Sequence, residues 1–327
     1  MESVNIKELN DRIQKESGFV DILSLEMGKV IVGQKHLVEN LMIALLANGH
    51  ILLEGVPGLA KTLAISTLSI AVNAKFSRIQ FTPDLLPADV VGTLIYSQKK
   101  EEFEVRKGPV FANFVLADEI NRAPAKVQSA LLEAMQERQV TIGDSTFKLP
   151  EPFLVMATQN PIEQEGTYPL PEAQLDRFML NIKMDYPSFD EEMDIVKRTT
   201  VDMNGELEVV LSAEEILEYQ SVIRRMPVPD NVVSYAVSLV AATRPDNEGN
   251  QLAHKYLSWG AGPRASQYLI MGAKTNAALN GKFSPDREDV DAVATEVLRH
   301  RLVRNYFAEA EGISTDSVIS ELKNSVK

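Results

Sequence analysis

A short glycine-containing segment constrains the fold more than any other part of the sequence. The segment GVPGLAKT, residues 55–62, follows a run of apolar residues at 51–53 and precedes a helical pattern over residues 63–72. The apolar run is typical of a buried strand, and the glycines let backbone N–H groups converge on an anion at the start of the helix. A strand, a phosphate-binding turn and a helix in this order predict an α/β fold with a parallel sheet.

The side chains of this segment indicate a site for a nucleoside triphosphate. We expect Lys61 to reach the outer phosphates and the Thr62 hydroxyl to bind Mg²⁺. The usual pattern has glycine immediately before the lysine, whereas this chain has Ala60. One methyl group is tolerable there if the backbone is helical. The predicted nucleotide contacts of this region are Gly55, Val56, Pro57, Gly58, Leu59, Ala60, Lys61, Thr62 and Leu63.

Polar side chains follow two further apolar runs. The run that ends at Ala117 continues into Asp118 and Glu119, and the run over 153–157 continues into a polar stretch that includes Asn160. We expect Asp118 to hold Mg²⁺ through its water and Glu119 to polarise the water that attacks ATP. Since the carboxyl ends of parallel strands line one crevice, Asn160 is predicted to orient this water or to sense the γ-phosphate. Taken alone, Asn160 and the proline after it are equally typical of a turn.

The pattern of apolar residues divides the chain into two parts. Strand-like runs alternate with helical patterns in the first part, which predicts a parallel five-stranded sheet covered by helices on both sides. Beyond Pro187 the apolar positions recur at helical spacing only, and Ser212 with Glu215 forms a capping box. We therefore expect an α/β domain at 1–187, with hairpins near 93–105 and 139–149, and an all-α domain at 188–327. The strand-like runs lie at 51–53, 76–81, 114–117, 153–157 and 178–184.

Composition narrows the classes of function. The net charge of −13 provides no overall positive field, so nucleic acid is not expected as a partner. The absence of cysteine favours the cytoplasm, the N-terminal sequence has no targeting pattern, and the longest apolar stretch is far short of the roughly 20 residues that a membrane span needs. The four histidines show no metal-binding spacing, and we expect them at the surface or at helix caps. The basic cluster over 298–304 is expected to be a solvated helix face or a contact with a neighbouring subunit.

Five motifs, taken in their order along the chain, resemble those of a known family. GVPGLAKT, LADEINRAP, ATQNP, LPEAQLDRF and GAGPRA resemble the AAA+ superfamily, in particular its MoxR branch. The resemblance implies an AAA+ P-loop NTPase αβα core and a helical lid, with Walker A at 55–62, Walker B at Asp118 and Glu119, and sensor 1 at Asn160. It also implies that Arg177 is the arginine finger and Arg264 is sensor 2. The segment Val32-Gly33-Gln34 resembles the one that packs on adenine.

The same resemblance implies an ATPase that works as a ring, with a hexamer as the expected form, and remodels or matures partner proteins. A von Willebrand factor A domain protein is the partner that the family suggests. The two hairpins resemble insertions that face the central pore, although no aromatic pore signature is evident. A chelatase-type motor for metal insertion and a nucleotide-gated binding switch remain alternatives. A P-loop kinase would leave the helical lid and its arginine unexplained.

Overall fold

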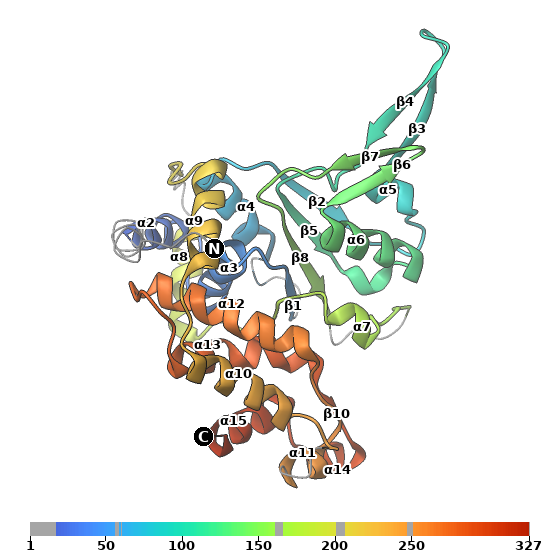
Figure 1. Cartoon of the computed structure of the whole chain (residues 1–327). Coiled ribbons are helices and arrows are strands. Elements are labelled where there is room, and N and C mark those ends of the chain that lie inside the picture. The colour runs from blue at the N-terminus through green and yellow to red at the C-terminus, as the bar shows by residue number, and fades with distance from the viewer. Residues whose placement is uncertain are drawn as a thin grey trace. The chain divides into compact units, whose positions relative to one another are not determined.

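The structure is a computed structural model of the 327-residue chain and describes residues 18–55, 59, 61–160, 166–200, 207–246 and 251–326. Figure 1 shows the order of its helices and strands. Four residues of the predicted phosphate-binding segment lie outside the described residues: Val56, Pro57, Gly58 and Ala60.

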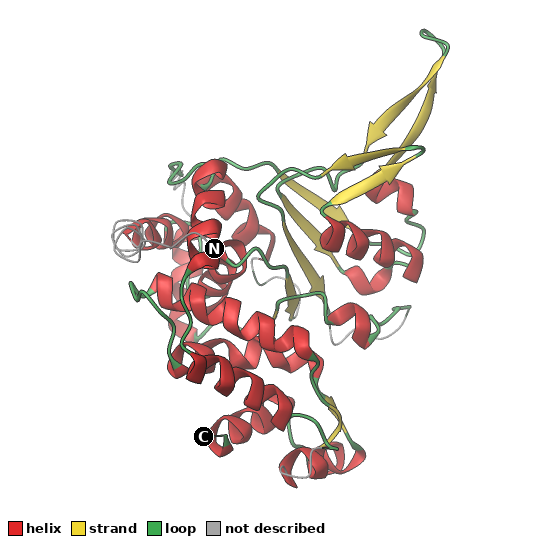
Figure 2. Ribbon diagram, in the orientation of Figure 1, coloured by secondary structure: helices red, strands yellow, loops and turns green. Residues whose placement is uncertain are grey.

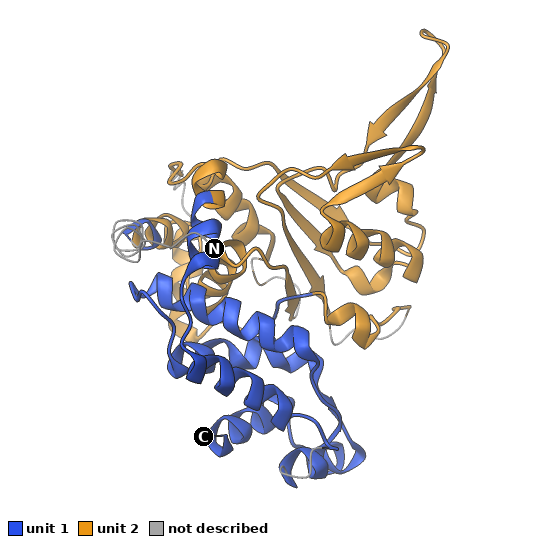
Figure 3. Ribbon diagram, in the orientation of Figure 1, with its two compact units in different colours: residues 1–20, 178–181, 218–327 blue, residues 21–177, 182–217 orange. Residues whose placement is uncertain are grey.

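The chain forms two compact units (Figure 3). The core unit consists of residues 21–177 and 182–217, and the helical unit consists of residues 1–20, 178–181 and 218–327. The boundary expected near residue 187 stays a prediction. The chain beyond it still belongs to the core unit, where the backbone N–H of Val210 bonds to the carbonyl of Ala71 at 2.7 Å.

A five-stranded sheet organises the core unit, with strand order β2-β5-β8-β1-β9. The pairs β1–β8, β5–β8 and β2–β5 are parallel, so the predicted sheet is confirmed. Most residues of the three central strands are buried, because helices cover both faces of the sheet. The strands are β1 (Ile51–Glu54), β2 (Phe76–Gln80), β5 (Phe114–Asp118), β8 (Leu154–Gln159) and β9 (Leu180–Lys183).

Helices lie on both sides of this sheet. The helices α3 (Lys35–Leu46) and α4 (Lys61–Ala71) lie on one side and α6 (Ala125–Glu137) on the other (Figure 1). Each buries a stripe of apolar side chains, as Val127, Leu131 and Ala134 do in α6. The remaining elements of the core unit are short or peripheral: α2 (Gly18–Gly28), α5 (Pro87–Val91), η1 (Ile120–Arg122), α7 (Glu172–Leu175) and α8 (Phe189–Thr199).

Two antiparallel hairpins extend the core unit. The strands β3 (Gly92–Ser97) and β4 (Glu102–Lys107) form a hairpin that extends away from the sheet (Figure 2). The second hairpin, β6 (Gln139–Ile142) with β7 (Ser145–Lys148), turns at Gly143, whose φ of +60° favours glycine. Tyr96 and Phe103 face each other across β3 and β4, with ring centroids 5.4 Å apart, and both are exposed. This aromatic pair is evident only once the register is known.

The second unit is helical, as predicted, apart from residues 180–181 of β9 and one small ladder. An antiparallel ladder of β10 (Leu257–Trp259) and β11 (Val303–Arg304) was not expected from the sequence. The capping box of Ser212 and Glu215 forms at the start of α9, with bonds of 2.7 and 3.2 Å. The helices are α9 (Ala213–Arg225), which spans both units, α10 (Asp230–Ala242), α11 (Gln251–Tyr256), α12 (Pro263–Leu279), α13 (Arg287–Leu298), η2 (Arg299–Arg301), α14 (Tyr306–Ala310) and α15 (Thr315–Ser325).

The basic cluster near residue 300 is not a solvated helix face. Arg301 is buried and donates to the carbonyl of Phe178 at 2.6 Å, and Arg299 donates to the carbonyl of Asn181 at 2.6 Å. Arg299 also pairs with Asp316 at 2.7 Å. The cluster therefore binds the backbone of residues 178–181 inside the helical unit.

Two histidines also differ from the expected surface positions. His50 is only 5% exposed, accepts a hydrogen bond from the Val155 N–H at Nδ1 (3.0 Å), and has Nε2 3.1 Å from the carbonyl of Met135. His300 Nε2 lies 3.1 Å from the carbonyl of Phe178. Both rings bind backbone groups that are distant in sequence.

Candidate nucleotide-binding site

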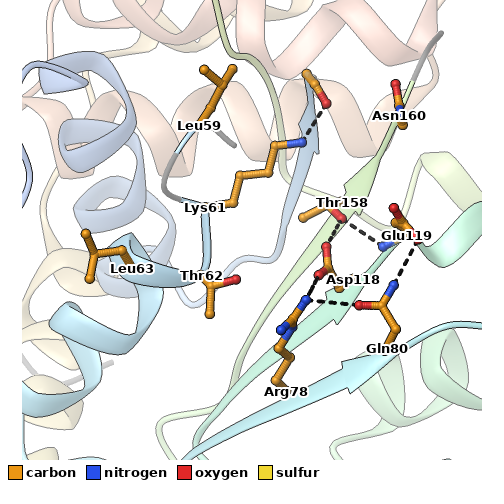
Figure 4. Close-up of a pocket in the computed structure, with 11 residues that line it drawn as sticks. Leu59, Lys61, Thr62, Leu63, Arg78, Gln80, Asp118, Glu119, Thr158 and Asn160 are labelled. Carbon is orange, nitrogen blue, oxygen red and sulfur yellow. Dashed lines mark hydrogen bonds and ion pairs between the residues drawn. The ribbon is translucent and has the colours of Figure 1, made fainter. Parts of the chain in front are cut away.

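A cavity of about 430 Å³ at the carboxyl edge of the sheet brings together eight of the predicted site residues (Figure 4). Parallel strands place their carboxyl ends at one edge, and β1, β2, β5 and β8 each contribute there. Three lining residues were not predicted: Arg78, Gln80 and Thr158. The full lining is Gly55, Leu59, Lys61, Thr62, Leu63, Arg78, Gln80, Asp118, Glu119, Thr158 and Asn160.

Lys61 opens α4 and lies in this cavity. Its Nζ donates a 2.6 Å hydrogen bond to the carbonyl of Gly55, at the end of β1. Burial lowers the pKa of Lys61, while the charges of Asp118 and Glu119 act in the opposite direction. An anionic phosphate beside the ammonium group would compensate for the water it has lost.

Asp118 and Glu119 are positioned by Thr158 on the neighbouring strand. The Thr158 hydroxyl donates to Asp118 Oδ1 at 2.7 Å and accepts a hydrogen bond from the Glu119 N–H at 2.8 Å. Glu119 has a φ of +56°, which is uncommon for a residue other than glycine. Strained backbone of this kind is concentrated at functional sites, and here it turns the chain directly after β5.

Arg78 and Gln80 contact the same two acids from β2. Arg78 donates to Asp118 Oδ2 through Nη2 at 2.6 Å and through Nε at 3.2 Å. Gln80 donates to Glu119 Oε2 at 2.9 Å, and Arg122 lies 3.3 Å from the same oxygen. Each carboxylate therefore already contacts a cation within the core unit.

The oxygen donors of this cavity suit a magnesium ion. Thr62 and Asp118 both line it, and hydroxyl and carboxylate oxygens are ligands that Mg²⁺ accepts alongside phosphate and water. The guanidinium of Arg78 on Asp118 Oδ2 indicates that a positive charge is favoured at this position. Among the described residues, no group of three or more His, Cys, Asp or Glu side chains forms a metal site of another kind.

The predicted adenine segment lies outside this cavity. Gly33 lines a second cavity of about 490 Å³, together with residues of α2 and α3, and has a φ of +66°. This positive φ favours glycine, and a Cβ atom at Gly33 would lie 2.6 Å from Oε1 at the flexible end of Glu191. Val32 and Gln34 are not among the described residues that line either cavity.

The two predicted arginines lie elsewhere in the chain. Arg177 follows α7 and is the last residue of its stretch of the core unit, and its side chain is not part of the lining of the 430 Å³ cavity as described. Arg264 is the second residue of α12, in the helical unit. Both side chains are partly exposed.

Arg78 and Gln80, which were not predicted as site residues, have only a weak signature in the sequence. Arg78 and Gln80 are two residues apart on β2, so their side chains point to the same face of the strand. That spacing is also typical of any half-exposed strand. Its meaning depends on the pairing of β2 with β5, which brings Gln80 beside Asp118.

Comparisons with known proteins agree with this arrangement. Residues 50–180 match the family described as "ATPase family associated with various cellular activities (AAA)", and residues 249–322 match the "AAA lid domain". The protein named Chaperone MoxR1 of Mycobacterium tuberculosis is 51% identical over 302 residues, which cover 92% of this chain and 80% of that protein. The chain belongs to the MoxR family of AAA+ ATPases. It is therefore an ATPase of a chaperone family.

Further relatives are similar over most of their length. The Bacillus subtilis protein YeaC is 43% identical over 92% of both chains, and the Protein MoxR of Methylorubrum extorquens is 30% identical over 85% of both. A solved structure of a candidate ATPase from Cytophaga hutchinsonii has a TM-score of 0.92 and 47% identity, and covers 99% of both chains. Within the part of the chain that the structure describes, no helix is both long enough and apolar enough to span a bilayer.

Proposed function

We propose that this MoxR protein hydrolyses Mg-ATP in the 430 Å³ cavity. The observation that supports this most is the presence of Lys61, Thr62, Asp118 and Glu119 in one cavity at the carboxyl edge of the sheet. Lys61 binds the outer phosphates, Thr62 and Asp118 hold the metal, and Glu119 polarises the attacking water. Asn160 orients this water. The metal supplies positive charge that offsets the charge developing on the transferred phosphoryl group.

We further propose that the working form is a ring, with six subunits as the expected number. Arg177 then completes the ATP site of a neighbouring subunit, and Arg264 contacts the nucleotide of its own subunit. Arginine suits both roles because it is permanently charged and bridges two phosphate oxygens. The segment Val32-Gly33-Gln34 packs on adenine, a role that rests on the family resemblance.

The energy of ATP hydrolysis serves to remodel or mature a partner protein, for which a von Willebrand factor A domain protein is our first expectation. The exposed Tyr96 and Phe103 on the β3–β4 hairpin offer an apolar surface for contact with a polypeptide. Co-purification from the native cell with Glu119→Gln, which keeps ATP bound, tests the partner. Fractionation of the same cells tests the expected cytoplasmic location.

Two variants separate binding from chemistry. Lys61→Ala removes the charge that offsets the phosphates, so ATP binding should be lost. Glu119→Gln removes only the water-activating carboxylate, so binding should persist while turnover falls below detection. Titration with a fluorescent ATP analogue and a phosphate-release assay measure the two effects. Equal loss of binding in both variants would contradict the assigned roles.

A further inference from the structure

Arg78 forms a short ionic contact in the proposed ATP site. Its Nη2 and Nε lie 2.6 and 3.2 Å from a single oxygen, Oδ2 of Asp118 (Figure 4). The other oxygen, Oδ1, accepts the Thr158 hydroxyl at 2.7 Å. Both oxygens of Asp118 are thus engaged, one by a neutral donor and one by a cation.

The position of Arg78 is set by its strand and by Gln80. Arg78 is paired with Leu116 and Gln80 with Asp118 in the β2–β5 register, so both side chains reach the acids from the adjacent strand. Arg78 Nη2 also donates to Gln80 Oε1 at 3.0 Å. The amide group of Gln80 in turn donates to Glu119 at 2.9 Å. The guanidinium is held by two partners, so its contact with Asp118 is oriented rather than incidental.

The contact matters because Asp118 and Glu119 place two negative charges beside each other where a polyanion is expected to bind. A guanidinium on Asp118 lessens the repulsion between this carboxylate and phosphate oxygens. A metal ion held at Asp118 Oδ2, directly or through its water, would occupy the position of the Arg78 guanidinium. The cation of the protein and the metal are therefore alternatives at Oδ2.

We propose that Arg78 is the counter-cation of Asp118 in the metal-free site and that it releases this carboxylate when Mg²⁺ binds. This inference rests on the proposed ATPase site and adds a residue to it. Removal of Arg78 should change two binding affinities in opposite directions. A metal ion meets an uncompensated Asp118 and binds more tightly. ATP without metal meets more negative charge and binds more weakly.

The variant Arg78→Met tests both effects, because methionine keeps much of the side-chain length without the charge. We expect the dissociation constant of Mn²⁺, measured by electron paramagnetic resonance without nucleotide, to fall about tenfold. We expect the dissociation constant of a fluorescent ATP analogue in EDTA to rise about tenfold. The shifts are moderate because Arg78 is half exposed and water screens its charge. Arg78→Lys, which keeps the charge, should shift both constants less than Arg78→Met.

Two controls and one substitute variant make the result specific. Arg225→Met, at the end of α9 in the helical unit, changes the net charge equally and should leave both constants as in the wild type. In an Asp118→Asn background, Arg78→Met should no longer raise Mn²⁺ affinity, because the carboxylate for which the two cations compete is absent. Arg78→Gln is the substitute if Arg78→Met fails to give a wild-type circular dichroism spectrum.

The outcomes separate this inference from the proposed function. Unchanged or weaker Mn²⁺ binding in a folded, uncharged Arg78 variant would overturn the role of Arg78, even where the wild type binds and hydrolyses Mg-ATP normally. A wild-type protein that fails to bind ATP with Mg²⁺ would overturn the proposed function itself. An increase in Mn²⁺ affinity that persists in Asp118→Asn would also count against the inference, since the effect would then arise at another site.

Discussion

Thr158 Oγ1 lies 2.7 Å from Asp118 Oδ1, a bond that joins the carboxyl ends of two adjacent parallel strands. The same hydroxyl accepts the Glu119 N–H at 2.8 Å. Thr158 is only 2% exposed, so water cannot replace these bonds readily. One buried hydroxyl therefore orients both acids of the site.

Thr158→Val should damage the site while preserving its shape. The substitution leaves the Glu119 N–H and one oxygen of Asp118 without this partner, so we expect a loss of roughly 1–3 kcal/mol in the free energy of unfolding. Misplaced acids should lower kcat by roughly ten- to a hundredfold. Urea denaturation and a phosphate-release assay measure the two effects. Thr158→Ser keeps the hydroxyl and should retain most of the activity. Equal kcat losses in both variants would contradict the orienting role.

Arg177 is expected to act on the ATP of a neighbouring subunit. Removing such a residue leaves binding nearly intact and lowers the rate by roughly 10³ to 10⁵. Mixing inactive Arg177→Ala protein with inactive Glu119→Gln protein should restore some hydrolysis, because mixed rings contain interfaces with both residues intact. Phosphate release at increasing total protein concentration provides the measurement, and it should rise more steeply than linearly as rings assemble.

The trans role of Arg177 has a clear contrary result. If subunits exchange, as shown by energy transfer between labelled chains, and the mixture stays inactive, then Arg177 does not serve a neighbour. Each single variant should bind ATP as the wild type does, which serves as the control for folding.

Arg264 should distinguish ATP from ADP. A guanidinium directed at the γ-phosphate has nothing to contact once this phosphate has left. Arg264→Ala should therefore weaken ATP binding about tenfold, the loss of one charge-assisted hydrogen bond, and leave ADP binding nearly unchanged. Calorimetric titrations with each nucleotide give both constants. An equal fall for ADP would identify Arg264 as a structural residue of α12.

His50 makes stability depend on pH in the acid range. Burial is the main cause that lowers the pKa of His50 well below 6.5, and the Arg138 charge adds to it. The unfolded chain therefore binds a proton near pH 6.5 that the folded chain does not. The free energy of unfolding should fall as the pH drops below about 6.5, and His50 alone contributes a slope of up to about 1.4 kcal/mol per pH unit. Urea denaturation from pH 7.5 to 5 measures this slope.

Variants distinguish the contribution of His50 to this pH dependence from that of the carboxylates, which also titrate. His50→Gln should be less stable at pH 7 but should lose part of the slope between pH 6.5 and 5. His300, whose pKa is also lowered by burial, should contribute a similar part. The exposed His254 is the matched control, and His254→Gln should keep the full slope. A wild-type slope in His50→Gln would show that His50 is not the group responsible.

Elements that depend on residues close together in the sequence could be predicted. The apolar runs became the five strands because a parallel sheet buries both of its faces. The Ser212–Glu215 capping box formed because its bonds join residues three apart. Lys61, Thr62, Asp118, Glu119 and Asn160 could be placed together because strands of one direction end at one edge.

Features that depend on distant partners could not be predicted. Arg78 acquires its role only when β2 pairs with β5, forty positions along the chain from Asp118. The surface expectation was wrong for Arg301, because its partner is the backbone carbonyl of Phe178, 123 positions away. It was wrong for His50, because this ring bonds Val155, 105 positions away. Hydrophobic periodicity carries no information about such pairs.

The basic cluster near residue 300 has a consequence for the backbone beside Arg177. Arg177 belongs to the core unit and Phe178 to the helical unit, although a single peptide bond joins them. Arg301 and His300 hold the carbonyl of Phe178. The carbonyl that these two side chains hold is one peptide bond away from the predicted arginine finger. The basic cluster near residue 300 therefore anchors the backbone that immediately follows Arg177.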